Sequence, residues 1–251
     1  MQSEILSAAI IIIGNEILSG KTQDQNIQFI ALELGELGIR LREIRVIPDL
    51  EDEIINTVNN LREKYTYVFT TGGIGPTHDD ITAEAIAKAF NDEYVLHNEA
   101  KDIIEKYLAD NNRRVSEGYM RMAHMPKNAL PLLNRETGAP GFKVDNVFVM
   151  AGVPYIMQAM FKEAKKFLKT GKPIISRSID VYVSESLIAA GFSALQDKYP
   201  QIEMGSYPFR RRDRWGTTLA LRGDDPELIE QALSELYQFL ASVTQSDNVT
   251  K

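Results

Sequence analysis

The sequence contains no cysteine, and this absence excludes disulfides, thiol catalysis and zinc sites built on cysteine. It is compatible with the cytoplasm, where we expect the protein to be located. Basic residues are also in the minority, since 28 Lys and Arg stand against 35 Asp and Glu, for a net charge of −7. Domains that bind nucleic acid are usually basic. We therefore expect no nucleic-acid partner.

The apolar stretch at residues 7–13 is too short to cross a bilayer, which takes about 20 residues. Glu4 precedes it, and neither a basic segment nor a small-residue cleavage site accompanies it. We therefore expect neither a signal peptide nor a membrane partner. A continuous apolar run of this length is typical of a strand that is covered on both faces.

Strands and helices alternate through the first third of the chain. The hydrophobic patterns predict strands at residues 8–13, 39–47 and 66–71, and helices that follow them at residues 27–38, 54–61 and 83–90. Asp24 or Asn26 would cap the first of these helices. This alternation is the pattern of a parallel sheet with right-handed crossovers, so we predict an α/β fold with a mostly parallel sheet.

The last third of the chain has a different order of elements. Residues 169–173 have the composition of a linker, and the elements after it follow a strand–helix–strand–strand–helix order. They are predicted at residues 179–183, 185–198, 202–204, 215–221 and 226–243. We predict a first domain at residues 1–170 and a smaller α+β domain at residues 174–244. The arginine run at residues 210–214 is either a solvated hairpin tip or a phosphate clamp.

Residues 70–82 form the most informative stretch, with the sequence TTGGIGPTHDDIT between a predicted strand and a predicted helix. Gly72, Gly73 and Gly75 let the backbone approach a ligand and turn its amides inward. The following helix start favours phosphate. Asp79 and Asp80 are placed to hold a metal or a water. The alternative is a tight turn in which one of these two aspartates caps the helix.

Other polar residues follow neighbouring strands. Asn15 and Glu16 come after the first strand and Asp49 comes after the second, and in parallel sheets ligands bind beyond the carboxyl ends of strands. Residues 14–22 differ from a P-loop because Asn15 stands at the position of its first glycine. A second turn from strand to helix, with Gly152 and Pro154, is a further candidate anion site.

Residues 70–82 resemble the hallmark loop of the molybdopterin-binding (MoaB/Mog-like) superfamily, and the Pro-Thr-His-Asp-Asp form resembles its CinA-type competence/damage-inducible branch. The resemblance covers roughly residues 5–170. Residues 205–209 are similar to the second domain of stand-alone CinA-like proteins and of the molybdopterin-binding-like half of some FAD synthases. The CinA-type branch also fits several other positions of this sequence, namely residues 14–20, Asn26, Asp49, Asn134 and residues 138–142.

The resemblance implies a three-layer α/β/α domain that binds a phosphorylated pterin or an adenine nucleotide. CinA-like and FAD-synthase-like relatives are associated with metal-dependent cleavage of pyrophosphates such as ADP-ribose or FAD. Asp80 matches the superfamily's catalytic loop carboxylate, and Asp49 matches its second acid. Residues 151–157 lack the first Pro and the Glu of the CinA pattern and are closer to the FAD-synthase-like subgroup. We expect no nicotinamide-nucleotide deamidase activity.

These observations lead to one expected function and one alternative. The first is a divalent-metal-dependent pyrophosphatase with Asp49 and Asp80 as catalytic residues and Asp49, Asp79 and Asp80 as ligands of Mg²⁺, Mn²⁺ or Co²⁺. The alternative is a non-catalytic molybdopterin- or nucleotide-binding protein or a factor of molybdenum-cofactor biosynthesis. The resemblance also implies a homo-oligomer. The expected ligand-binding residues are Asn15, Glu16, Thr71, Gly72, Gly73, Gly75, Thr77, Gly152 and Pro154.

Overall fold

The computed structural model describes residues 6–247, and the chain divides into two compact units, Met1–Gly171 and Lys172–Lys251. None of the helices in the described residues has the length and apolar character needed to cross a membrane. The elements of the first unit are β1 (Ser7–Ile13), α1 (Asn15–Leu18), α2 (Asn26–Glu36), β2 (Arg40–Ile47), α3 (Glu51–Lys64), β3 (Tyr67–Thr71), α4 (Thr82–Ala89), β4 (Tyr94–Leu96), α5 (Asn98–Asp110), α6 (Glu117–Arg121), β5 (His124–Pro126), β6 (Leu130–Leu132), β7 (Gly141–Val144), β8 (Val147–Met150), α7 (Pro154–Ala164) and the 3-10 helix Lys165–Phe167.

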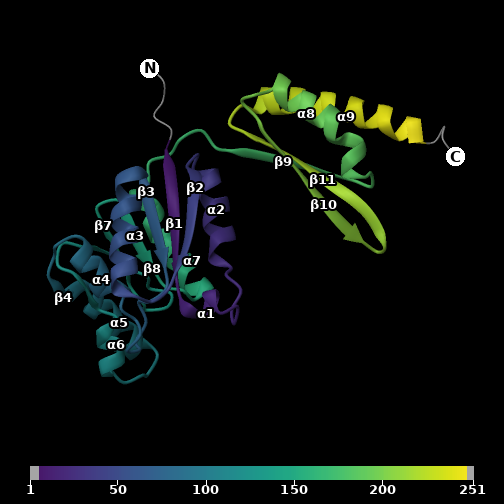
Figure 1. Cartoon of the computed structure of the whole chain (residues 1–251). Coiled ribbons are helices and arrows are strands. Elements are labelled where there is room, and N and C mark those ends of the chain that lie inside the picture. Colours follow the sequence, from purple (N-terminus) through teal and green to yellow (C-terminus); the bar gives the residue numbers. More distant parts are fainter. Residues whose placement is uncertain (1–5, 248–251) are drawn as a thin grey trace, which may run out of the picture. The chain divides into compact units, whose positions relative to one another are not determined.

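The first unit is built on a six-stranded sheet with the order β2-β1-β3-β8-β7-β6 (Figure 1). The pairs β1–β2, β1–β3 and β3–β8 are parallel, whereas β7 pairs with both β8 and β6 in the antiparallel sense. The prediction of an α/β fold with a mostly parallel sheet is therefore confirmed. The antiparallel edge, formed by β6 and β7, was not predicted.

Both faces of β1 are buried, as its continuous apolar run predicts. Ile11 and Ile13 belong to a core with side chains of α3 and α4, and Ile10 and Ile12 belong to a second core with side chains of α2 and α7. Figure 1 shows these helix pairs on opposite sides of the sheet. The arrangement has three layers, with helices on both faces of a central sheet.

The second unit contains β9 (Ile175–Val181), α8 (Glu185–Lys198), β10 (Glu203–Arg211), β11 (Arg214–Gly223) and α9 (Pro226–Asp247). Its three strands form an antiparallel sheet with the order β10-β11-β9, and its core joins side chains of α8 and α9 to Leu219 and Leu221. The predicted smaller α+β domain is confirmed. Arg212 and Asp213 occupy a two-residue hairpin turn with φ angles of 48° and 62°, so the arginine run surrounds the tip of the β10–β11 hairpin.

The edge strand β2 carries a carboxylate with three hydrogen-bond donors. Glu43 accepts bonds from Arg45 Nε at 2.7 Å, from Lys64 Nζ at 2.8 Å and from the Tyr65 hydroxyl at 2.6 Å. These bonds, with that of Lys64 contributing most, lower the pKa of Glu43 from 4.5 to about 2. The side chain is 23% exposed, so solvent weakens the network.

Glu43→Gln is expected to lower the free energy of unfolding by about 1–2 kcal/mol near neutral pH. Because the pKa is lower in the folded protein than in the unfolded chain, the stabilisation by Glu43 is complete above pH 4.5 and is lost as the pH falls toward 2. Urea unfolding of both proteins between pH 7 and pH 3 measures the effect. The difference between them is expected to shrink as the pH falls below 4.5, and a constant difference would contradict the prediction.

Candidate functional site at the carboxyl edge of the sheet

The order of the strands creates a topological switch point at the carboxyl edge of the sheet. The connection from β1 to β2 runs through α2 on one face, and the connection from β2 to β3 runs through α3 on the other face. The chain therefore leaves the carboxyl ends of β1 and β3 in opposite directions. In open α/β sheets such a switch point is where ligands bind. The loop of residues 72–81 begins there, directly after β3.

Two glycines give this loop its course. Gly72 donates its N–H to the Met150 carbonyl at 3.0 Å and has a φ of 106°. A Cβ atom at Gly72 would overlap the carbonyl oxygen of Ile13, so the loop passes directly against the end of β1. Gly73, with a φ of 68°, accepts a bond from Thr82 N at 2.9 Å, and a Cβ there would overlap the Thr82 hydroxyl. Only glycine fits these two positions without a shift of the surrounding backbone or side chains.

The Asp80 carboxylate is held inside the loop. Its Oδ2 accepts hydrogen bonds from Thr77 N at 2.8 Å and from the Thr77 hydroxyl at 2.6 Å. The same oxygen lies 2.7 Å from the position of a Cβ at Gly75, so this glycine makes room for it. No described residue bonds Asp80 Oδ1. The carboxylate is thus fixed through one oxygen while the other is available to a ligand.

The alternative in which an aspartate caps the following helix is wrong. The residue before α4 is Ile81, and no side chain accepts a hydrogen bond from the first turn of that helix. Asp79 is exposed and lies 4.0 Å from His78 Nδ1. The pKa of Asp79 is lowered by the Thr77 hydroxyl when that hydroxyl turns toward it, and by the residue's own backbone amide. A hydroxyl has one proton, so Thr77 can serve one carboxylate at a time, and the 2.6 Å distance assigns it to Asp80.

Asp49 connects the loops that follow β2 and β1. Its Oδ2 accepts the N–H of Asn15 at 2.8 Å, and beside it Gly14 N donates to the Ile47 carbonyl at 3.1 Å. The second oxygen of Asp49 has no bond to a described residue. Asn15 and Glu16 are exposed in the short helix α1. The structure therefore brings Asp49 and Asn15 together and leaves a carboxylate oxygen free beside the end of β1.

The turn after β8 lies against the glycine loop. A Cβ at Gly152 would be 3.4 Å from the Gly72 Cα, so two predicted ligand-binding glycines are neighbours. Pro154 is the first residue of α7, and no side chain caps that helix. Thr71, in contrast, is 1% exposed, and its hydroxyl has no partner among the described residues. The structure places Thr71 beneath the loop and Gly152 at its surface.

Asn26 has a role at this edge that the sequence did not reveal. Asp24 bonds Ile27 N at 2.8 Å at the start of α2, so Asn26 is not needed as a cap. Asn26 is 2% exposed and donates its side-chain N–H to the Gly152 carbonyl at 2.8 Å, while its Oδ1 has no partner in the described chain. Besides the fit of Asn26 to the CinA-type branch, the sequence signal is a polar residue directly before an apolar helical stripe. Asn26 holds the turn after β8 in place.

Arg121, at the end of α6, is a second residue that sequence reasoning missed. Its Nη2 lies 3.5 Å from the His78 carbonyl and 3.4 Å from the Asp80 carbonyl, so it supports the loop from outside. A small cavity that touches Gly75 and Asp80 adjoins a larger one of about 600 Å³. Tyr94, Arg121 and His124 line both. The larger cavity has the size of small-molecule sites.

The carboxylates at this edge are candidate ligands for a divalent cation. Within residues 6–247, no group of three or more His, Cys, Asp or Glu side chains is arranged to hold a metal. Asp49 and Asp80 each keep one free oxygen, and Mg²⁺ is commonly held by one or two carboxylates together with waters and substrate phosphates. The residues present therefore fit a cation that substrate helps to bind.

A family model described as "Probable molybdopterin binding domain" matches residues 9–170, and one described as "FAD synthase, middle domain" matches residues 173–247. A protein of Archaeoglobus fulgidus is 32% identical over 232 residues, which is 92% of this chain and 96% of the relative. A protein of Clostridium botulinum named as competence-damage inducible is 36% identical over 161 residues, which is 62% of this chain. The match covers only 39% of that relative's length.

Among solved structures, the protein CinA of Thermoplasma acidophilum, described as having unknown function, is similar with a TM-score of 0.59 and 31% identity. The similarity covers 65% of this chain and 99% of that one. The resemblance to the molybdopterin-binding superfamily and to CinA-type proteins is thereby confirmed. The second family match agrees with the similarity of residues 205–209 to FAD synthases.

Proposed function

The chain belongs to the family of probable molybdopterin-binding domains over residues 9–170, and on this basis we propose that it is a divalent-metal-dependent pyrophosphatase. Its substrates are phosphorylated nucleotides of the ADP-ribose or FAD type. The observation that carries the proposal is the Asp80 carboxylate, fixed by Thr77 within a glycine loop at the switch point of the sheet. This arrangement offers a free carboxylate oxygen beside a loop suited to phosphate.

Several backbone groups support binding of the pyrophosphate. The amides of residues 73–75 belong to the loop and donate to no backbone carbonyl of the described residues, whereas the Gly72 amide is bonded to Met150. The starts of α4 and α7 carry no side-chain cap that would compete with an anion. A helix start attracts phosphate because its first N–H groups are unpaired and its end carries partial positive charge. The same donors would stabilise charge that develops on the phosphoryl oxygens during cleavage.

The reaction is a hydrolysis in which water adds to one phosphorus and the bond from that phosphorus to the bridging oxygen breaks, giving two phosphate monoesters. Mg²⁺, Mn²⁺ or Co²⁺ held by Asp49 and Asp80, with Asp79 beside them, would neutralise phosphate charge. Asp80 Oδ1 is available to accept a hydrogen bond from the attacking water. Thr77 keeps Asp80 in position throughout, and Asn26 does the same for the turn at Gly152.

Purified protein with Mg²⁺, Mn²⁺ or Co²⁺ is expected to convert ADP-ribose to AMP and ribose 5-phosphate, or FAD to AMP and FMN. Excess EDTA is expected to lower the rate about 100-fold or more, and added metal is expected to restore it. Chromatography of the products measures both rates, and AMP as a substrate without a pyrophosphate bond serves as the control. Absence of turnover with all three metals, or turnover that EDTA leaves unchanged, would contradict the proposal.

A second candidate function is a non-catalytic binder of molybdopterin or nucleotide, or a factor of molybdenum-cofactor biosynthesis. The observation that favours it is that no group of three metal-binding side chains forms in the described part of the chain. A glycine loop and two uncapped helix starts suffice for binding an anion. Calorimetry that finds micromolar affinity for nucleotide, together with no turnover in the metal screen, would select this function over hydrolysis.

A further inference from the structure

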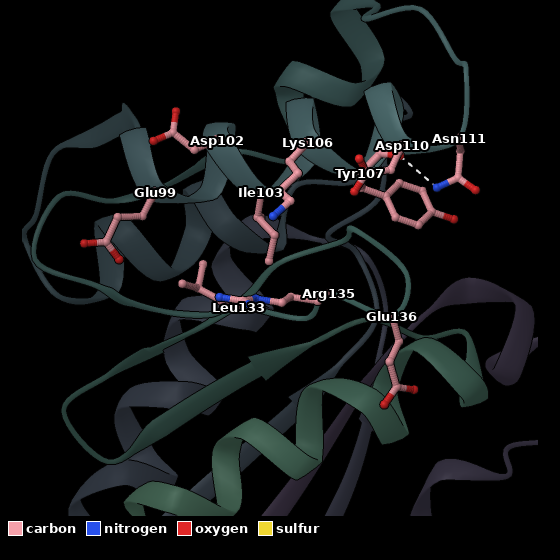
Figure 2. A pocket seen from close by; sticks show the side chains of 10 residues that line it. All are labelled: Glu99, Asp102, Ile103, Lys106, Tyr107, Asp110, Asn111, Leu133, Arg135 and Glu136. Carbon is pink, nitrogen blue, oxygen red and sulfur yellow. Dashed lines mark hydrogen bonds between the residues drawn. The ribbon is translucent and has the colours of Figure 1, made fainter.

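The first unit contains a cavity of about 670 Å³ between α5 and the loop that joins β6 to β7 (Figure 2). The volume lies within the range of small-molecule sites. None of its lining residues belongs to the glycine loop at residues 70–82, and none has a role in the proposed hydrolysis. The cavity is therefore a candidate for a second binding site.

Two cations enter this cavity from different elements. Figure 2 shows the Lys106 ammonium reaching down from α5 and the Arg135 guanidinium extending from the loop, with Ile103 beside the Lys106 ammonium. Neither side chain has an ion pair or hydrogen bond with a described residue. Two unpaired like charges that face one space repel each other, and a bound anion would relieve that repulsion.

The carboxylates around the cavity do not supply this anion. Glu136 is paired with Lys162 Nζ at 2.9 Å. In Figure 2 the Glu99 and Asp102 carboxylates point away from the space between Lys106 and Arg135, and Asp110 ends α5 one turn after Lys106. The acidic groups therefore form the rim, while the two cations reach the centre.

The loop that carries Arg135 is closed by its own hydrogen bonds. Asn134 is 2% exposed, and its Oδ1 accepts the N–H groups of Glu136 at 2.9 Å and Thr137 at 3.2 Å, while its amide donates to the Thr137 hydroxyl at 2.6 Å. Gly138, with a φ of 68°, lies so close to the Tyr107 ring that a Cβ would overlap it. The loop is thus fixed against α5, and Arg135 starts from a defined position.

We propose that this cavity binds an organic anion, with its phosphate or carboxylate group between Lys106 and Arg135 and its apolar body against Ile103 and Leu133. An Arg guanidinium binds either group through two parallel hydrogen bonds, and a Lys ammonium adds a point charge. Partly exposed Ile103 and Leu133 supply the apolar contact. Such a pairing of a few polar groups with an apolar wall is typical of small-molecule sites.

The test uses the full chain with labelled Ile and Leu methyl groups and two probes, phenyl phosphate and phenylacetate, with inorganic phosphate for comparison. Titration is expected to shift the NMR signals of Ile103 and Leu133. Lys106→Gln and Arg135→Gln are each expected to weaken binding about 5-fold or more. The control is Lys101→Gln on the same helix, where Lys101 pairs with Glu105 at 3.6 Å outside the cavity. It is expected to leave the affinity unchanged.

The outcomes separate this site from the proposed hydrolytic one. Tighter binding of phenyl phosphate assigns a phosphate ligand, and tighter binding of phenylacetate assigns a carboxylate. Shifts confined to Ile74 and Ile81, which lie in the loop that carries Asp80, would overturn the proposal. Equal affinities of the wild type and the Lys106→Gln/Arg135→Gln double variant would overturn it as well. Methyl spectra of the variants that match the wild type outside the cavity show that each variant is folded. Loss of hydrolysis has no bearing on these readouts.

Discussion

Gly72→Ala is expected to lower the free energy of unfolding of the first unit by about 2–5 kcal/mol, because it combines an unfavourable φ with a steric overlap. The φ of 106° is accessible to glycine, and the added Cβ would overlap the carbonyl oxygen of Ile13. That oxygen belongs to the buried strand β1, which is paired on both sides, so it cannot move without disturbing the sheet. Domains are commonly stable by only about 5–15 kcal/mol.

Gly20→Ala is the matched control, since Gly20 has a φ of 72° but no atom within 4 Å of the position of its Cβ. It is expected to cost only about 1–2 kcal/mol, from the backbone alone. Urea unfolding followed by far-UV circular dichroism measures both variants. Trp215 is the only tryptophan and lies in the second unit, so its fluorescence follows that unit separately. Equal losses in the two variants would contradict the overlap with Ile13.

The strands and helices of the first unit could be predicted where the spacing of apolar residues along the chain determines the type of element. The continuous apolar run of β1 required cover on both faces, and the alternation of strands with amphipathic helices required parallel pairing. The strands β6 and β7 were missed because Pro131 within the first and Gly141 at the start of the second are typical of loops. β6 is the edge strand of the sheet, where a proline is tolerated because fewer backbone partners are needed, and Gly141 is tolerated as the first residue of β7.

Strand β10 of the second unit was also predicted incompletely because it contains glycine and proline. Only residues 202–204 were predicted as a strand, yet β10 extends to Arg211 through Gly205 and Pro208. β10 is an edge strand, and proline is tolerated there because its missing N–H removes no bond to the neighbouring strand. Met204 N, which also faces outward, is bonded by Gln196 Oε1 at 2.9 Å. An edge that lacks these donors is less prone to pair with another chain.

The candidate site was predictable where topology alone brings residues together. Asp49 follows β2 and the glycine loop follows β3, the two strands on either side of β1. Because the three strands are parallel, both segments lie at the same edge of the sheet. The contacts of Asn26 with Gly152, and of Arg121 with the His78 and Asp80 carbonyls, could not be predicted. Both join residues more than forty positions apart through side chains whose direction depends on tertiary packing.

Asp80→Asn is expected to lower kcat for dinucleotide hydrolysis by about 100–1000-fold, the range for removal of a group that stabilises charge at a reacting centre. The Asn oxygen can still accept both hydrogen bonds from Thr77, so the loop is expected to keep its form. The amide group would then replace Oδ1 by a donor that carries no charge. It can neither attract a cation nor accept a hydrogen bond from water.

Asp145→Asn is the matched control for this substitution. Asp145 lies in the turn between β7 and β8, at the edge of the sheet opposite the site, and its φ of 49° is one that asparagine tolerates. Asp145→Asn is expected to leave kcat unchanged. Thr77→Val removes one of the two hydrogen bonds to Asp80 and is expected to lower kcat by about 10-fold.

Steady-state kinetics with ADP-ribose, together with calorimetry of AMP binding, separates the two functions considered for this site. A fall in kcat with AMP affinity kept within about 3-fold would place Asp80 in the chemical step, because its loss would affect the transition state more than the bound nucleotide. Equal loss of affinity and rate would instead make Asp80 a binding residue. Turnover by Asp80→Asn at the wild-type rate would contradict the catalytic role. The amides of residues 73–75 and the uncapped helix starts would then serve binding alone.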